Sequence, residues 1–455
     1  MNRVTTILKQ SFSNNTYDYT KGSINTAIIM LALPMLMEMV MESLFAIVDT
    51  YFVSKLGTLA LATVGLTESL LSIVYSLAMG LSMAATAIVA MRVGEKNYTA
   101  AAKTSAQTIV LTIILSLSIA IVGLLFAKQL LSALGASAQV IQYGSNYTYI
   151  ALGGNIVIVM LFVLNGIFRG AGNAGIAFRS LLIANGINII CCPIFINYYG
   201  ITGAALATLV GRTCGVIYQI YNLTQSNNLF TILKSYYKPH KATIINILNI
   251  AWSASLQFII ASGSWIFLSK LIANFGDSAI AGYTIAIRIL LFFIMPAWGI
   301  SNAAATLVGQ NLGAMQYLRA EACVWQTAKV NALFMALVTL TSLLFGSSIV
   351  QFFTHNSSLV IVATQAMHIL SIGYIVYGIG MVVLNAFNGA SDSRTPSLIN
   401  FLGYWCLQIP LAWFIATQTK YGMAGVFYAI VITEFLVTLT SCYLFKQGKW
   451  KQKKI

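Results

Sequence analysis

Three acidic residues, Glu38, Glu42 and Asp49, stand in one apolar stretch near the N-terminus. On a helix that turns 100° per residue, their spacings of four and seven residues place them within a stripe of about 40° on one side. Because an acid near the centre of a bilayer costs about 2.5 to 3.5 kcal/mol, this stripe must face protein or water. The carboxylates could bind a proton or Na⁺, or they could form fixed ion pairs with arginine or lysine.

Two further acids, Glu68 and Glu434, and three basic residues, Arg212, Lys270 and Arg288, also fall in apolar stretches. We expect the basic side chains to be structural partners of the embedded glutamates, with Lys270 reaching toward the membrane surface. A direct role of these basic residues in a substrate path is the alternative.

The composition indicates which elements position these residues. Of the 455 residues, 58% are hydrophobic and only 8% are charged, whereas a soluble domain carries about 25% charged residues. Apolar runs of about 20 residues or more recur along the chain, and each can cross a hydrocarbon core about 30 Å thick. We therefore predict an all-α polytopic membrane protein with twelve transmembrane helices, near residues 25–54, 60–90, 100–127, 139–167, 175–197, 200–223, 246–275, 279–309, 317–346, 357–388, 394–418 and 421–446.

Basic residues are concentrated at both termini and in every second loop between the predicted helices. The intervening loops hold few basic residues, among them Lys55, His355 and Lys420. By the positive-inside rule both termini are cytoplasmic, in a multi-pass protein of the plasma membrane, which is the inner membrane of a bacterial cell. This distribution accounts for the net charge of +15, so we expect no nucleic acid partner.

The two halves of the chain repeat each other at a shift of 219 residues. Glycines lie at matching positions in the two halves: Gly57 and Gly276, Gly80 and Gly299, Gly94 and Gly313, Gly170 and Gly389. The run from Gly80 to Ala85 also resembles the run from Gly299 to Ala304. Near the end of each half the shift is 222, where Arg212 and Glu434 fall at equivalent positions. A duplicated six-helix unit explains the order and the constant offset, and because six is even both copies insert with the same orientation.

The repeat predicts two pseudo-symmetric six-helix bundles, at residues 25–223 and 246–446. A polar cytoplasmic linker, 224–245, joins them. A cytoplasmic segment, 1–24, precedes the first bundle, and a basic cytoplasmic tail, 447–455, follows the second.

Several short motifs resemble those of the multidrug and toxic compound extrusion (MATE) transporters, and the resemblance covers nearly the whole chain. They are Pro34 followed by Val48-Asp49-Thr50, the turn Arg169-Gly170-Ala171-Gly172-Asn173, Asn188 before Pro193, Gly203-Ala204-Ala205-Leu206-Ala207-Thr208, and the turn from Asn388 to Pro396. The resemblance implies a V-shaped pair of bundles around a central cavity. It further implies a cation-coupled antiporter that exports small amphipathic, often cationic, compounds in exchange for inward H⁺ or Na⁺.

The resemblance also assigns expected roles to residues of the first bundle. Asp49 matches the cation-coupling aspartate of the family, Asn188 and Thr208 would complete its site, and Glu38 and Glu42 are further candidates. Pro34 removes one backbone hydrogen bond and permits a kink in the first helix.

The chain departs from the family pattern where many members carry a second carboxylate in the fifth predicted helix. Cys192 stands there. The predicted helices 246–275 and 357–388 also lack the acids that one branch of the family uses for Na⁺. Both departures favour H⁺ over Na⁺ as the coupling ion.

Polar and aromatic residues of the second bundle are candidates for the substrate cavity: Gln257, Asn302, Tyr374, Tyr377 and Asn385. Tyrosines at helical spacing more often pack in the protein interior than bind a ligand. We expect a monomer that needs no metal or organic cofactor, with drugs, H⁺ or Na⁺ and the bilayer as its partners.

Three other classes compete with this interpretation. A flippase for a lipid-linked precursor, from the same broader superfamily, would line its cavity with several arginines. We expect no enzyme, because the three histidines form no catalytic pair and no nucleotide-binding glycine-rich lysine loop is present. The function of an ion channel would not explain the two-bundle repeat.

Overall fold

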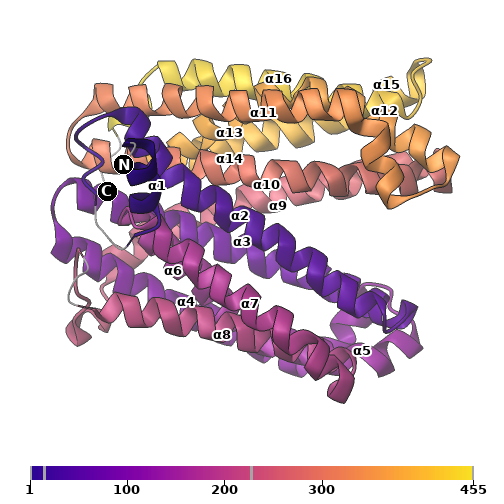
Figure 1. Ribbon diagram of the computed structural model, residues 1–455, viewed down its shortest axis with the longest axis horizontal. Helices are drawn as coiled ribbons and strands as arrows, with labels where there is room; N and C mark the ends of the chain where they lie inside the picture. The colour runs from indigo at the N-terminus through magenta and orange to yellow at the C-terminus, as the bar shows by residue number, and fades with distance from the viewer. Residues whose placement is uncertain (1–2, 14–16, 226–228, 453–455) are drawn as a thin grey trace.

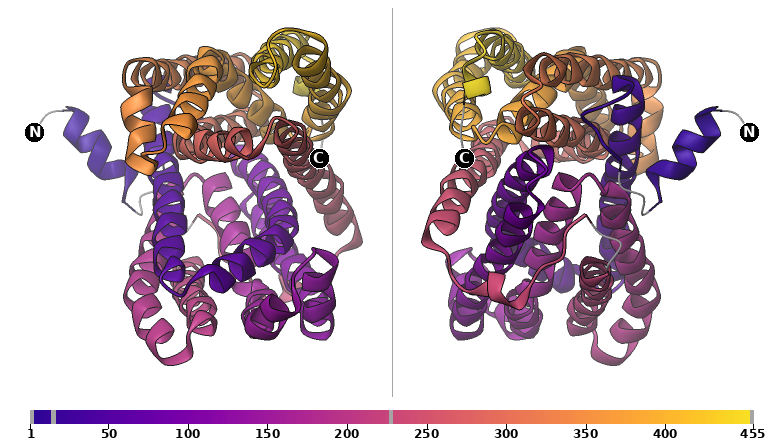
Figure 2. Two further views of the ribbon diagram at one scale, coloured as in Figure 1. Left: turned by 90° about the vertical axis from the view of Figure 1, so that its right-hand side faces the viewer. Right: turned by 90° about the vertical axis from the view of Figure 1, so that its left-hand side faces the viewer.

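The computed structural model describes residues 3–13, 17–225 and 229–452, and nearly all of them are helical. One group of helices comes from each half of the chain (Figures 1 and 2). The first group holds α2 Ile24–Ser54, α3 Thr58–Gly94, α4 Tyr98–Ala133, α5 Ala138–Gly153, α6 Asn155–Gly170, α7 Ala174–Tyr199 and α8 Ile201–Thr224. The second holds α9 Lys241–Ala273, α10 Asp277–Gly313, α11 Tyr317–Phe353, α12 Ser357–Ile372, α13 Tyr374–Gly389, α14 Arg394–Asn400, the π-helix η2 Phe401–Gln408, α15 Ile409–Gln418 and α16 Ala424–Lys446.

Eleven helical segments in the described part of the chain are long and apolar enough to cross a membrane, and the bent pair α12 and α13 brings the count to twelve. The expected all-α architecture and twelve spans are therefore confirmed. The predicted helix at 357–388 is broken, because α12 and α13 meet at Gly373 with a bend of 56°. Gly154, which is equivalent to Gly373 at the shift of 219, separates α5 from α6, so the interruption is part of the repeat.

Short helices lie outside the predicted spans. The N-terminal segment contains α1, Arg3–Ser11, and the linker contains the 3-10 helix η1, Lys234–Tyr237. Gln107 of α4 holds the linker, because its Nε2 donates to the carbonyls of Tyr236 and Lys238 at 2.5 and 2.8 Å. A further 3-10 helix, η3 Lys449–Gln452, follows α16.

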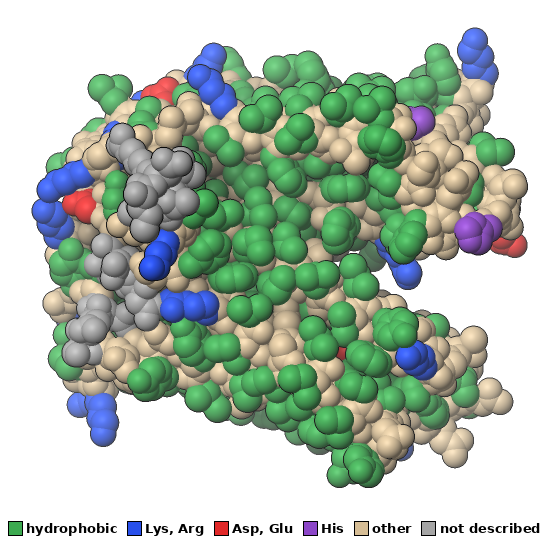
Figure 3. Space-filling model, viewed as in Figure 1, with side chains coloured by type: hydrophobic (Ala, Val, Ile, Leu, Met, Phe, Trp, Pro, Cys, Tyr) green, Lys and Arg blue, Asp and Glu red, His purple; other side chains and the backbone are tan. Residues whose placement is uncertain are grey.

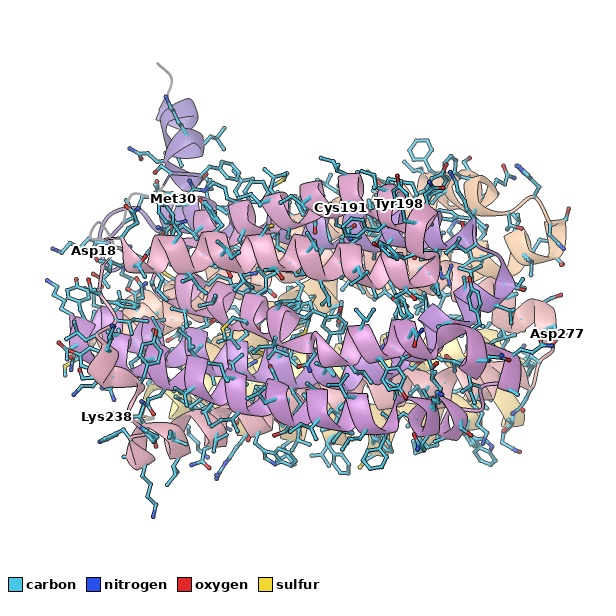
Figure 4. The ribbon with its side chains drawn as sticks, turned by 90° about the horizontal axis from the view of Figure 1, so that it is seen from below. Asp18, Met30, Cys191, Tyr198, Lys238 and Asp277 are labelled. Atoms are coloured by element: carbon cyan, nitrogen blue, oxygen red, sulfur yellow. The ribbon has the colours of Figure 1, made fainter. Side chains whose placement is uncertain are left out.

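Both chain ends lie at the same end of the molecule, as an even number of crossings requires (Figure 1). Asp18 and Lys238 lie at this end, and Asp277 lies at the opposite one (Figure 4). The two bundles separate at the end opposite the termini, where the space-filling view shows a hollow between them (Figure 3). Each bundle is packed around its own apolar core.

The bundles join at the end that carries the termini, through glycines of α3 and α10. A Cβ atom on Gly94 would lie 2.0 Å from the Gln310 carbonyl oxygen, and one on Gly313 would lie 2.0 Å from the Met91 carbonyl oxygen. Gly94 and Gly313 are equivalent in the repeat, so the two helices cross around a local two-fold axis. The backbones approach this closely only because neither glycine has a side chain.

Hydrogen bonds across the junction add to the glycine contacts. Thr306 Oγ1 and Gln310 Nε2 of α10 donate to the carbonyls of Arg169 and Gly170, at 3.1 and 3.0 Å. Tyr19, in the segment before α2, donates to the Gly172 carbonyl at 2.9 Å. The junction therefore uses the predicted turn after α6.

The first helix of each half also packs on the other half. Gly80 of α3 lies against α9, since its Cβ would come 2.6 Å from the Ala251 carbonyl oxygen. Its equivalent, Gly299 of α10, lies against α2, since its Cβ would come 2.5 Å from the Met35 carbonyl oxygen. The start of α2 is thus fixed to the second bundle.

The glycine crossing generates a stability prediction. Gly94→Ala should lower the melting temperature of the purified protein, because the added methyl group clashes with backbone atoms that cannot move independently, a cost of about 1 to 3 kcal/mol. Gly65→Ala in the same helix is the matched control, because nothing lies within 4 Å of its Cβ position. Alanine favours helix at both sites, so equal melting temperatures for the two variants would contradict the assigned crossing.

Candidate functional site

The acidic stripe of α2 faces the interior of the first bundle, and Glu38 is its most buried member. Asn165 Nδ2 and Arg169 Nη1, both on α6, lie 3.0 and 3.4 Å from Glu38 Oε1. Arg169 Nη2 also donates to Ser82 Oγ on α3 at 2.9 Å. Glu38 Oε2 is buried without a hydrogen-bond partner among the described residues.

A buried polar cluster surrounds Asn165 and was not anticipated from the sequence. Asn165 Oδ1 accepts hydrogen bonds from Ser180 Oγ of α7 and from Gln219 Nε2 of α8. Gln219 Nε2 also donates to Ser180 Oγ at 3.0 Å. Polar residues on three apolar helices were the available signal, but only the packing shows that they meet.

Glu42 forms a two-pronged ion pair with Arg212 of α8. Arg212 Nη2 and Nη1 lie 2.7 and 3.1 Å from the two carboxylate oxygens of Glu42. The guanidinium also stacks over the Phe45 ring, 4.6 Å from its centroid. Arg212 is therefore the structural partner of an embedded glutamate, as expected from the sequence.

Asp49 has no ion pair within the described residues. Its nearest polar contact is the thiol of Cys192 on α7, with Sγ at 3.9 Å from Oδ1. Glu68 and Arg212 interact with it electrostatically, the first unfavourably and the second favourably. The carboxylate lies among groups that neutralise it only in part.

Asn188 and Thr208, which the resemblance implied as parts of the site, contact each other near Cys192. Asn188 is on α7, one turn before Cys192, and its Nδ2 lies 3.4 Å from Thr208 Oγ1 on α8. Asn188 Oδ1 is buried without a hydrogen-bond partner among the described residues. This amide oxygen is an unused acceptor one helical turn from the thiol that contacts Asp49.

Two tyrosines of the first bundle, Tyr75 and Tyr147, were missed by the sequence analysis. Both interact electrostatically with Asp49, and Tyr147 is almost completely buried. They come from α3 and α5, so helices other than α7 and α8 also contribute polar side chains that interact with Asp49. No motif marks them, because tyrosine is common in this chain.

Pro34 lies inside α2 and is buried, fifteen positions before Asp49. Its neighbour Met35 makes the backbone contact with Gly299 described above. The proline therefore stands in the part of α2 that packs on α10 of the second bundle, and this contact continues to Ser43, whose Oγ lies 3.2 Å from Met295 Sδ.

The predicted cavity residues divide into three groups. Gln257 is buried and hydrogen-bonded to Asn388 at 3.0 Å and to the Ser393 carbonyl, so its contacts are internal to the second bundle. Asn302 and Asn385 line a small space of about 20 Å³ where the bundles meet. Tyr374 and Tyr377 line a separate space inside the second bundle.

Glu68 of α3 and Arg288 of α10 are both exposed, and they interact electrostatically although they belong to different bundles. An interaction from one bundle to the other requires both side chains to lie near the space between them. Arg288 is therefore not the close structural partner that we expected, since no ion pair within 4 Å involves it in the described part of the chain. Lys270 is exposed near the end of α9, as expected.

The six cysteines are free. No group of three or more His, Cys, Asp or Glu side chains in the described ranges could hold a metal ion.

The Glu42 ion pair generates a second prediction. Arg212→Met should destabilise the protein by up to about 3 kcal/mol, because the partly buried Glu42 would lose the arginine that compensates its charge. The double variant Glu42→Gln with Arg212→Met should recover much of the loss. Chemical denaturation in detergent measures the free energy of unfolding of the single and the double variant. The control is Arg92→Gln, which breaks a surface ion pair with Glu95 and should cost less than about 1 kcal/mol. Equal losses in the Arg212 and Arg92 variants would contradict the assigned burial.

Comparison with known proteins agrees with this architecture. The sequence model of the MatE family matches two segments, residues 34–194 and 253–414, so both halves match at the offset of the repeat. The chain is 22% identical over 446 residues to "Probable multidrug resistance protein YoeA" of Bacillus subtilis, with 96% of each chain covered. It is 23% identical to "Multidrug export protein MepA" of Staphylococcus haemolyticus, with 94% of each covered.

Among solved structures, the fold is similar to that titled "Crystal structure of MATE in complex with MaL6". The TM-score is 0.91 at 25% identity, and the match covers 96% of this chain and 99% of the other. Two six-helix halves, a hollow between them and a family match over most of the chain lead to one conclusion. This chain is a multi-pass membrane protein that belongs to the MatE family of multidrug efflux transporters.

Proposed function

We propose that the protein is an H⁺-coupled antiporter that exports small amphipathic, often cationic, compounds across the plasma membrane, with Asp49 as the coupling carboxylate. One observation carries the proposal. Of the three acids on the inner stripe of α2, Glu38 and Glu42 are each ion-paired with an arginine, whereas Asp49 has no such partner in the described part of the chain. Asp49 is thus the member of the stripe with a charge left to exchange.

The position of α2 explains how this charge could act on the whole molecule. Its start packs on α10 of the second bundle, and its second half packs in the first bundle beside α7. When Asp49 takes up a proton, its attraction for polar groups around α2 weakens, and the helix can repack around the kink that Pro34 permits. A change in α2 would shift one bundle relative to the other, as alternating access requires.

The groups around Asp49 support a proton rather than Na⁺. Hard cations take several oxygen ligands, and here the position of a second carboxylate is filled by Cys192, whose thiol is a poor ligand for Na⁺. Asn188 and Thr208 offer an amide and a hydroxyl oxygen, and no second charge. One carboxylate suffices for one proton.

The space between the bundles supports the drug path. It opens at the end opposite the termini (Figure 3), so with cytoplasmic termini, as the basic loops predict, the structure faces outward. Glu68 would place a negative charge near this space, which suits a cationic compound. The names of the two curated relatives refer to multidrug resistance and export.

The proposal predicts that Asp49→Asn abolishes coupled efflux while insertion and folding stay intact, because asparagine keeps the shape but cannot carry the proton. Ethidium efflux from cells that express each variant at equal levels measures this, with an uncoupler in one arm and Na⁺ omitted in another. Glu95→Gln, a surface acid at the end of α3, is the control that should behave as wild type.

Three results would change the account. Full efflux by Asp49→Asn would remove Asp49 from the mechanism. Loss of efflux when Na⁺ is omitted would overturn the assignment of H⁺. Absence of efflux from cells that express the wild type would favour the flippase alternative.

A further inference from the structure

A partly buried acid in the second bundle, Glu434, has no role in the mechanism proposed above. Glu434 of α16 lines a cavity of about 40 Å³, whose other walls include Trp265 of α9 and Tyr374 and Tyr377 of α13. Ligand pockets for drug-sized molecules measure about 300 to 1,000 Å³. The cavity is therefore much too small for an exported drug, but it has room for a water molecule or a small cation.

The internal repeat shows why this acid lacks a partner. Glu434 occupies the position of Arg212 in the first bundle, and Arg212 is paired because α2 carries Glu42 opposite it. The residue of α9 that corresponds to Glu42 at the shift of 219 is Ala261. The second half thus keeps an ionisable group at this position without the opposite charge.

Phenols are the polar groups that face Glu434. Tyr404 of η2 and Tyr377 of α13 both interact with it electrostatically. Tyr374 also lines the cavity, while α9 and α10 contribute only Trp265 and apolar side chains. No lysine, arginine or histidine is among the electrostatic partners of Glu434 in the described ranges.

Other titratable groups on the surrounding helices face elsewhere. His368 of α12 and Tyr428 of α16 line a different, more open cavity. Arg288 of α10 interacts with Glu68 across the space between the bundles. Lys270 is exposed near the end of α9.

A local irregularity places Tyr404 beside the acid. Residues Phe401–Gln408 form a π-helix within the span that begins at Arg394. Two hydrogen bonds tie this segment to α9, from Trp405 Nε1 to the Ile260 carbonyl at 2.9 Å and from Ser264 Oγ to Gln408 Oε1 at 2.9 Å. Isolated π-turns inside helices occur frequently at functional sites.

We propose that Glu434, with Tyr404 and Tyr377, forms a second proton-binding site, so that each transport cycle exchanges two protons, one at Asp49 and one at Glu434. The inference rests on the proposed H⁺-coupled antiport. A lone carboxylate in an apolar bundle must be neutralised, and the small cavity with hydroxyl donors suits a proton. Release of that proton leaves a carboxylate that the phenols can stabilise by donating hydrogen bonds.

The number of protons can be measured in proteoliposomes that hold the full chain, with tetraphenylphosphonium as the transported cation and the membrane potential clamped to zero. For each proton exchanged per transported cation, the equilibrium ratio of the tetraphenylphosphonium concentrations on the two sides of the membrane rises about tenfold per unit of pH difference. Wild type should reach about a hundredfold per unit and Glu434→Gln about tenfold. Glu95→Gln should match wild type.

The outcomes separate the two claims. A wild type that does not respond to the pH difference would contradict the proposed function itself. Equal ratios for wild type and Glu434→Gln would overturn the second site and leave the first intact. If a Na⁺ gradient drives accumulation in wild type and Glu434→Gln loses that drive, the site holds an alkali cation and the assignment of a proton is wrong.

A second measurement covers the case in which Glu434→Gln does not fold. Trp265 lies in the same cavity, so the fluorescence of the purified wild type, minus that of Trp265→Phe, should change with pH in the absence of drug and Na⁺. A difference signal that stays constant across the pH range in which both proteins are folded would contradict a titrating group at Glu434.

Discussion

The close crossing of α3 and α10 at Gly94 and Gly313 is the constraint on which the rest of the structure depends. It holds the two bundles together at the end that carries the termini. A second glycine pair, Gly80 and Gly299, seats the first helix of each half on the other half. Since these contacts extend from the end that carries the termini to about the middle of α3 and α10, the bundles are free to separate at the other end.

Charge burial imposes the second constraint. The first bundle contains three acids on one face of α2, and arginines from α6 and α8 neutralise two of them. Arg169 has a double role, because its side chain binds Glu38 while its carbonyl accepts a hydrogen bond from Thr306 of the second bundle. Arg169 thus connects the buried charges of the first bundle to the junction between the bundles. Asp49, which no arginine neutralises by an ion pair in the described ranges, remains as the exchangeable charge.

Much of the fold could be predicted from the sequence, because its determinants are local or repeated. Long apolar runs define the spans, and the glycines at a shift of 219 define the two halves. The bend at Gly373 and the π-helix at 401–408 were missed, since each depends on how neighbouring helices pack rather than on the composition of the segment.

Prediction of the site was more limited for the same reason. The stripe formed by Glu38, Glu42 and Asp49 follows from helical geometry, and its inward orientation is confirmed. Which arginine meets which glutamate depends on inter-helix packing, so the partner of Glu38 was not foreseen. Gln257 forms a buried hydrogen bond to Asn388, and sequence alone does not distinguish such an internal contact from a cavity position.

The central claim is that Asp49 carries the proton that is exchanged for the exported compound, and the most direct test is proton release on drug binding. Purified protein in weakly buffered detergent solution is mixed with tetraphenylphosphonium, and the released protons are counted with a pH indicator. The account predicts that wild type releases one proton more than Asp49→Asn at equal occupancy. Equal release by the two proteins would contradict it.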